Sequence, residues 1–114
     1  MTKHTPYIIL SKPQLGENIG SSARAMKNFG IDKLRLIEPR DGWPNTSSYA
    51  ISAGADDILD NLECFSSLDK ASHDISLLIA TTARKRVIGT KSLNIIEAIS
   101  KSFQHVINGG KVGF

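Results

Sequence analysis

Apolar residues along this chain form short continuous runs separated by stretches with helical spacing. The first two runs, Tyr7–Leu10 and Leu34–Ile37, consist of β-favouring residues, as expected for strands buried on both faces of a sheet. Between them, Ile19, Ala23 and Met26 recur at intervals that place them on one side of a helix. The pattern therefore predicts a βαβ unit, whose two strands should be parallel.

Polar and small residues mark the expected ends of this first helix. The loop Ser11–Glu17 leads to Asn18, a residue type preferred at the N-cap, so we expect the helix to begin there. We also expect its apolar stripe to continue to Phe29. Gly30 should end the helix as a left-handed C′ residue.

The rest of the chain repeats this alternation of strands and helices. The further predicted elements are a helix at Tyr49–Leu59, a short strand at Leu62–Phe65, helical turns at Leu68–Ser72, a buried strand at Ile75–Ala80, a helix at Ser92–Asn108 and the start of a strand at Lys111–Phe114. The predicted fold class is α/β, with one parallel sheet and helices on both faces. Because each helix needs a sheet face to cover, we expect residues 1–114 to be a truncated single domain.

Composition narrows the class of protein. Of 114 residues, 40% are apolar and 22% are charged, which is typical of one globular domain. The net charge of +3 permits a polyanionic partner without requiring one. The apolar runs are too short to span a membrane, and the single Cys64 favours the reducing cytoplasm. His4, His73 and His105 are scattered, so the sequence predicts no metal site.

Two polar loops follow predicted strands and are candidates for chemistry. Ser11–Ser22 and Thr81–Arg86 should lie at the carboxyl ends of strands, where open α/β sheets bind ligands. The first loop enters a helix N-terminus, which favours an anion. Gly20 would allow a partner to approach the backbone closely, and the Arg24 guanidinium could bind a phosphate. The same residue types also occur on many helices that bind nothing, so the pattern alone leaves both interpretations open.

Several segments, in order, resemble one enzyme family. The stretches "PQLGENIGSSARAMKNFG", "LRLIEPR", "AGADDIL" and "ATTAR" resemble the TrmJ-like branch of the SpoU/TrmH family, the SPOUT RNA 2′-O-ribose methyltransferases. The resemblance implies the Rossmann-like N-terminal part of a trefoil-knot fold, with the cofactor-binding knot beyond Phe114. It also implies S-adenosylmethionine as cofactor, an RNA substrate, in this branch the anticodon loop of tRNA, and a homodimer.

Residue roles follow from the same resemblance. Asn18 corresponds to a residue that orders the active-site loop, and Arg24 to an arginine that contacts the ribose 2′-hydroxyl and the adjacent phosphate across a subunit interface. The predicted cofactor-binding residues are Thr81, Thr82 and Ala83. The predicted RNA-binding residues are Gly20, Arg24, Lys27, Arg84 and Arg86.

Two other functions remain to be weighed against a methyltransferase. The first is a non-catalytic RNA-binding or assembly remnant, which would use cations such as Lys12, Lys27 and Arg84–Arg86 on phosphates. The second is a different nucleotide-binding enzyme, which is disfavoured because no glycine-rich phosphate-loop motif follows the first strand.

Overall fold

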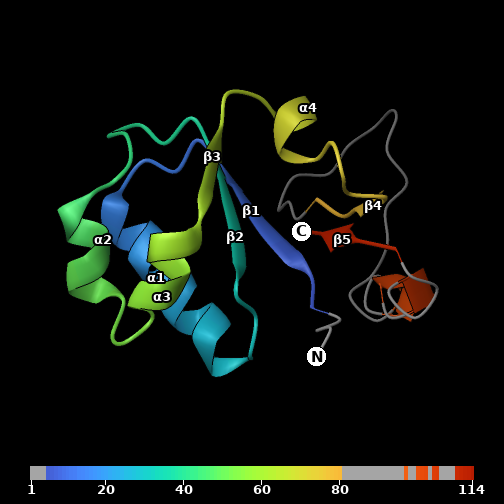
Figure 1. Cartoon of the computed structure of the whole chain (residues 1–114), viewed down its shortest axis with the longest axis horizontal. Coiled ribbons are helices and arrows are strands. Elements are labelled where there is room, and N and C mark those ends of the chain that lie inside the picture. The colour runs from blue at the N-terminus through green and yellow to red at the C-terminus, as the bar shows by residue number, and fades with distance from the viewer. Residues whose placement is uncertain (1–4, 81–96, 98–99, 103, 106–109) are drawn as a thin grey trace.

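A parallel β-sheet is the centre of the fold (Figure 1). The computed structural model describes residues 5–80, 97, 100–102, 104–105 and 110–114. Its strands are β1 (Tyr7–Ser11), β2 (Lys33–Ile37), β3 (Glu63–Phe65), β4 (Leu77–Leu78) and β5 (Val112–Gly113). Its helices are α1 (Gly16–Asn28), α2 (Thr46–Ile51), α3 (Asp56–Asn61) and α4 (Leu68–Ala71).

The strand order is β3-β2-β1-β5-β4, and each neighbouring pair is parallel. β1 and β2 pair along their whole length, from Tyr7 opposite Lys33 to Ser11 opposite Ile37. β5, from the end of the chain, then lies between β1 and β4. The predicted α/β fold class with one parallel sheet is therefore confirmed. The junction of β1 and β5 is the point where the strand order reverses.

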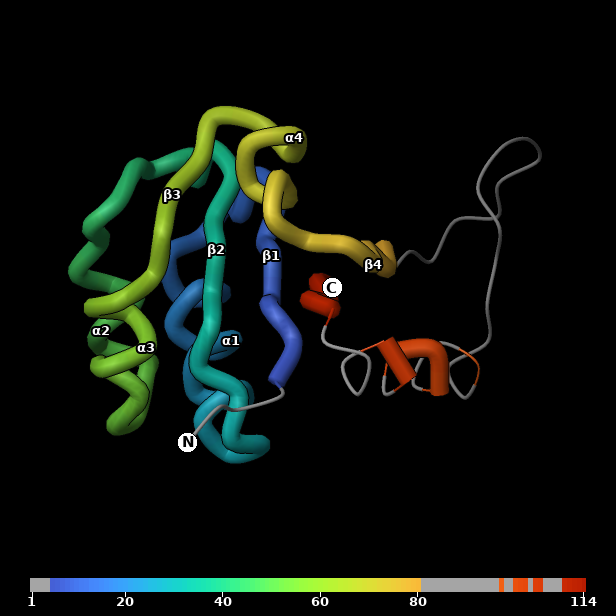
Figure 2. The backbone as a smooth tube through the Cα atoms, turned by 45° about the vertical axis from the view of Figure 1, so that its right-hand side comes forward, coloured from blue at the N-terminus to red at the C-terminus, as the bar shows by residue number. Residues whose placement is uncertain are grey.

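Both faces of the sheet are covered, as predicted. Leu34 and Leu36 of β2 point toward α1 and α3, which gather with α2 on one side of the strands (Figure 2). Arg35, between them in sequence, points to the opposite face and donates a hydrogen bond to the carbonyl oxygen of Ala71 in α4. The buried apolar cluster consists of Ile19, Ala23, Met26, Leu34, Leu36, Ala55, Ile58 and Leu59.

The ends of α1 confirm one prediction and overturn two. Gly30 has φ of 72°, and its N–H donates to the carbonyl oxygen of Lys27 while the N–H of Ile31 donates to that of Met26. This is a Schellman motif, as predicted. Asn18, however, lies inside the helix, because the N-cap is Leu15. Phe29 is 80% exposed, since the chain leaves the helix before its side chain can reach the core.

Two other elements differ from prediction. The single helix expected at Tyr49–Leu59 is broken into α2 and α3, because Ala53 and Gly54 adopt left-handed backbone with φ of 50° and 91°. The strand expected at Ile75–Ala80 is reduced to β4. Of the helix expected at Ser92–Asn108, residues 97, 100–102 and 104–105 are described, and these are helical. No helix in the described ranges is long and apolar enough to cross a membrane.

Candidate functional site

The carboxyl ends of β1 and β2 meet at one edge of the sheet. Ser11 and Ile37 are paired as the last residues of the two strands, so Lys12 and Glu38 follow side by side. β5 flanks β1 on its other side, where the strand order reverses. Open α/β sheets bind ligands in the crevice outside such a reversal. We call this region, from Ser11 to Leu15 and around Glu38, the carboxyl edge.

Helix α1 begins at the carboxyl edge, and its first residues pack closely against α2. A Cβ atom at Gly20 would collide with the carbonyl oxygen of Ser48, and one at Gly16 would collide with the side chains of Asn45 and Ser47. The Ser48 hydroxyl also donates to the carbonyl oxygen of Gly16 at 2.7 Å. The close approach expected at Gly20 is thus made by α2 of the same chain. This packing accounts for both glycines without an RNA contact.

Arg24 and Asn18 are both exposed on α1, but they do not share one face. Helical geometry separates them by about 9 Å along the axis and about 120° around it. Among the described residues, the Arg24 guanidinium makes no hydrogen bond or ion pair. Arg24 is therefore exposed and free of partners within the described part of the chain, and its role stays a prediction.

Lys27 lies in the last turn of α1, far from the carboxyl edge. Its ammonium lies 3.0 Å from the Asp57 carboxylate of α3, and both side chains are largely exposed. The ammonium lowers the pKa of Asp57, mainly through its hydrogen bond to the carboxylate. An RNA phosphate at Lys27 would have to compete with this ion pair.

The predicted cofactor residues Thr81, Thr82 and Ala83, and the predicted RNA contacts Arg84 and Arg86, lie outside the described residues. The strand that leads to them is described. The backbone N–H of Ile79, beyond β4, donates to the carbonyl oxygen of Gly113 at 2.9 Å. The chain therefore enters this segment beside β5, on the flank of the strand reversal.

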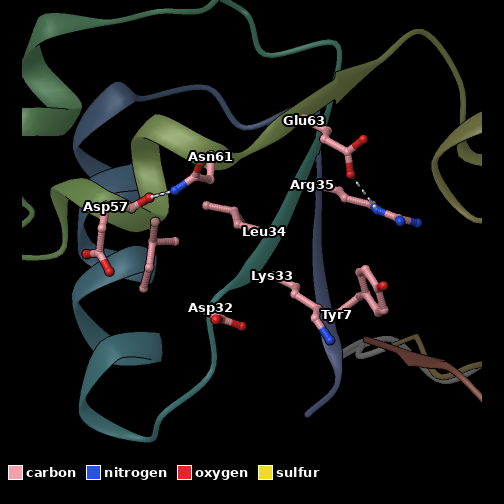
Figure 3. A pocket seen from close by; sticks show the side chains of 9 residues that line it. Tyr7, Asp32, Lys33, Leu34, Arg35, Asp57, Asn61 and Glu63 are labelled. Carbon is pink, nitrogen blue, oxygen red and sulfur yellow. Dashed lines mark hydrogen bonds and ion pairs between the residues drawn. The ribbon is translucent and has the colours of Figure 1, made fainter. Parts of the chain in front are cut away.

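A concavity lies at the opposite edge of the sheet, where β1 and β2 begin. This hollow of about 360 Å³ is shown in Figure 3. It is lined by Tyr7, Asp32, Lys33, Leu34, Arg35, Asp57, Ile58, Asn61 and Glu63. The lining mixes three carboxylates with two cations, and several of these groups are already paired with each other or with Lys27. No group of His, Cys, Asp or Glu in the described ranges could hold a metal ion.

Arg35 beside this hollow serves the fold. Its side chain is only 5% exposed, and its guanidinium donates to both carboxylate oxygens of Asp74, at 2.6 and 2.9 Å. The guanidinium also lies 4.2 Å from the centre of the Tyr7 ring. The hydrogen bonds from the Arg35 guanidinium hold the pKa of Asp74 well below its usual range. The pair fastens the segment after α4 to the far face of the sheet, a role that the sequence did not reveal.

Comparison with known proteins decides the family. A family model described as the SpoU rRNA Methylase family matches residues 5–107, which is most of the chain. This chain belongs to the SpoU methylase family. A tRNA (cytidine/uridine-2′-O-)-methyltransferase TrmJ from Sodalis glossinidius is 39% identical to it over 101 residues, covering 89% of this chain and 39% of that protein. A tRNA (cytidine/uridine/adenosine-2′-O-)-methyltransferase TrmJ from Pseudomonas aeruginosa is 36% identical over 95 residues, covering 83% and 37%.

Solved structures of the SpoU methylase type share the fold. TrmJ from Z. mobilis is 44% identical, with a TM-score of 0.89 over 96% of this chain and 47% of that one. A probable methylase family protein from Haemophilus influenzae is 34% identical, with a TM-score of 0.86 over 99% of this chain and 46% of that one. The chain thus spans less than half the length of these relatives.

Proposed function

We propose that this SpoU-family protein transfers a methyl group from S-adenosylmethionine to a ribose 2′-hydroxyl in the anticodon loop of tRNA. The match to the family over residues 5–107 carries the proposal, and the names of the TrmJ relatives supply the substrate class. Arg24 supports it, because this arginine is exposed on the helix that follows the carboxyl edge and has no partner among the described residues. We place the reaction in the cytoplasm, where tRNA is available.

S-adenosylmethionine, when bound, supplies an electrophilic methyl group attached to a sulfonium. The segment Thr81–Ala83 would hold it, and the described chain leads to that segment beside β5. Ile79, the described residue beside β5, lies on the flank of the strand reversal, where an α/β sheet of this kind accommodates a ligand. The cofactor would supply this methyl group to the ribose 2′-oxygen, whose proton would pass to solvent.

Arg24 acts on charge in this scheme and does not remove the proton. A guanidinium has a pKa above about 12, so it stays protonated and is a poor general base. It can donate two parallel hydrogen bonds to the adjacent phosphate. It can also stabilise negative charge that develops on the ribose oxygen. In the proposed homodimer, Arg24 of one subunit serves the reaction centre of the other.

The test is methylation of an unmodified tRNA transcript by the full-length protein with S-adenosylmethionine. Nuclease digestion and mass spectrometry of the nucleosides should show a 2′-O-methylated ribose in the anticodon loop. Methylation on a base would overturn the proposed chemistry. Tight tRNA binding with no methyl transfer would instead favour a non-catalytic RNA-binding protein.

We expect these 114 residues alone to bind S-adenosylmethionine weakly or not at all, because they cover 39% of the length of the Sodalis relative. Isothermal titration calorimetry measures this directly. Micromolar affinity would show that these residues hold a complete cofactor pocket.

A further inference from the structure

The carboxyl edge contains two corners that are built in the same way. Lys12 follows β1 and Glu38 follows β2, and both have left-handed backbone, with φ of 51° and 43°. Each is followed by a proline, Pro13 or Pro39, which favours extended backbone in the residue before it. Both residues therefore occupy a conformation that their covalent structure disfavours.

Glycine would remove this conflict, because it has no Cβ. The other left-handed positions among the described residues are Gly30, Gly42, Gly54 and Ala53, none of which carries a charged side chain. Lys12 and Glu38 instead carry long charged side chains at a conformational cost. Disfavoured backbone of this kind is concentrated at ligand sites and active sites, where the side chain is needed.

The fold itself does not use the Lys12 side chain. It is exposed, and its ammonium makes no hydrogen bond or ion pair with any described residue. The backbone N–H of Lys12 donates to the carbonyl oxygen of Ile37 at 2.7 Å, so the base of the side chain is fixed by the sheet. Among the described residues, the other charged groups near this edge are Glu17 in the first turn of α1, Glu38, and the Arg40–Asp41 pair, whose members contact each other at 3.2 Å.

We propose that Lys12 contacts a backbone phosphate of the RNA substrate at the carboxyl edge, outside the ends of β1 and β2. This inference rests on the proposed function and adds a contact residue at the end of β1 to the one proposed at Arg24 on α1. An ammonium on a flexible stem is suited to a phosphate, which it binds as a point charge. Glu38, on the β2 side, repels a phosphate and so directs the RNA backbone toward the strand reversal.

Three variants of the protein separate charge from backbone conformation. Lys12→Gly removes both the ammonium and the disfavoured backbone, while Glu38→Gly relieves the matching corner and removes a negative charge. Lys12→Arg keeps the charge. The probe is an unmodified tRNA transcript, and its affinity is measured by filter binding over a range of salt concentrations.

We expect Lys12→Gly to weaken tRNA binding by about fivefold to tenfold and to reduce the salt slope by about one. Glu38→Gly should bind at least as tightly as the unchanged protein, and Lys12→Arg should bind within about twofold of it. Neither glycine variant should unfold at a lower temperature, because glycine adopts this backbone freely. A loss of affinity in Lys12→Gly therefore cannot be attributed to a weaker fold.

An unchanged affinity and salt slope in Lys12→Gly would overturn the inference, as would an equal loss in Glu38→Gly. Arg24→Ala provides the comparison with the proposed function. If Arg24→Ala weakens tRNA binding and Lys12→Gly does not, only the Lys12 contact fails. If the unchanged protein does not bind tRNA, the proposed function and the Lys12 contact both fail.

Discussion

The packing of α1 against α2 yields a sharp prediction for Gly20→Ala. The added methyl group would collide with the carbonyl oxygen of Ser48 and lie 3.0 Å from its carbonyl carbon. These are backbone atoms, which cannot rotate away as the end of a side chain can. The two helices would have to separate, and the 2.7 Å hydrogen bond from the Ser48 hydroxyl to Gly16 would be strained or lost.

Opposing contributions set the size of the effect. Alanine gains about 1 kcal/mol over glycine inside a helix. Overpacking a close contact costs about 1–3 kcal/mol, and here the upper end applies because backbone must move. Loss of the hydrogen bond adds about 1 kcal/mol. The net expectation is that Gly20→Ala lowers the free energy of unfolding by about 2–3 kcal/mol.

Urea denaturation followed by tryptophan fluorescence measures this change. Trp43 stacks on Tyr49 of α2 with ring centres 6.1 Å apart, so its emission reports on this junction. Gly16→Ala is the matched control, because the three atoms nearest its new methyl group belong to the Asn45 and Ser47 side chains, which can move, so the change should cost about 1 kcal/mol. A Gly20→Ala variant as stable as the unchanged protein would refute the packing argument.

Two electrostatic predictions follow from paired carboxylates. Because Arg35 lowers the folded-state pKa of Asp74, this carboxylate stabilises the fold above its unfolded pKa of about 3.9 and loses the effect as pH falls toward the folded value. Asp74→Asn should therefore lower the free energy of unfolding, measured by urea denaturation near neutral pH, by about 3 kcal/mol, and by less in acid. A difference between the two proteins that does not depend on pH would contradict this expectation. The hydrogen bond to Asp60 and burial raise the pKa of Tyr49 to about 12. The protonated Tyr49 therefore stabilises the fold fully below about pH 10, its unfolded pKa, and this stabilisation is lost as pH rises through the folded pKa. Ultraviolet titration should show this late phenolate, and Asp60→Asn should return it toward its ordinary pKa; an unchanged titration would exclude the Asp60 contact as the cause.

The sequence predicted the fold wherever local pattern and tertiary packing agree. The runs that became β1 and β2 are continuous and apolar, and Gly30 supplies the left-handed residue that a Schellman end requires. The break between α2 and α3 could not be read, because Ala53 is a good helix former that the surrounding packing places in left-handed backbone. The prediction that α1 begins at Asn18 was wrong, because tertiary contacts at Gly16 favour an earlier start of the helix.

The candidate site was predictable only in part. The roles of Asn18 and Arg24 come from the family resemblance and stay predictions, and the structure leaves both residues exposed. Gly20 indicated a close approach, but the sequence could not tell that α2 makes it. The left-handed backbone at Lys12 carries no signal in residue type, since a lysine before a proline is usually extended.

The most direct test of the central claim compares Arg24→Lys with the unchanged full-length protein in 2′-O-methylation of tRNA. Lysine keeps the positive charge but loses the two-pronged donor, so the account predicts a rate lower by about 10- to 100-fold, with unfolding unaffected at this exposed position. Turnover of Arg24→Lys close to that of the unchanged protein would contradict the claim that this guanidinium binds the phosphate and stabilises the reacting oxygen.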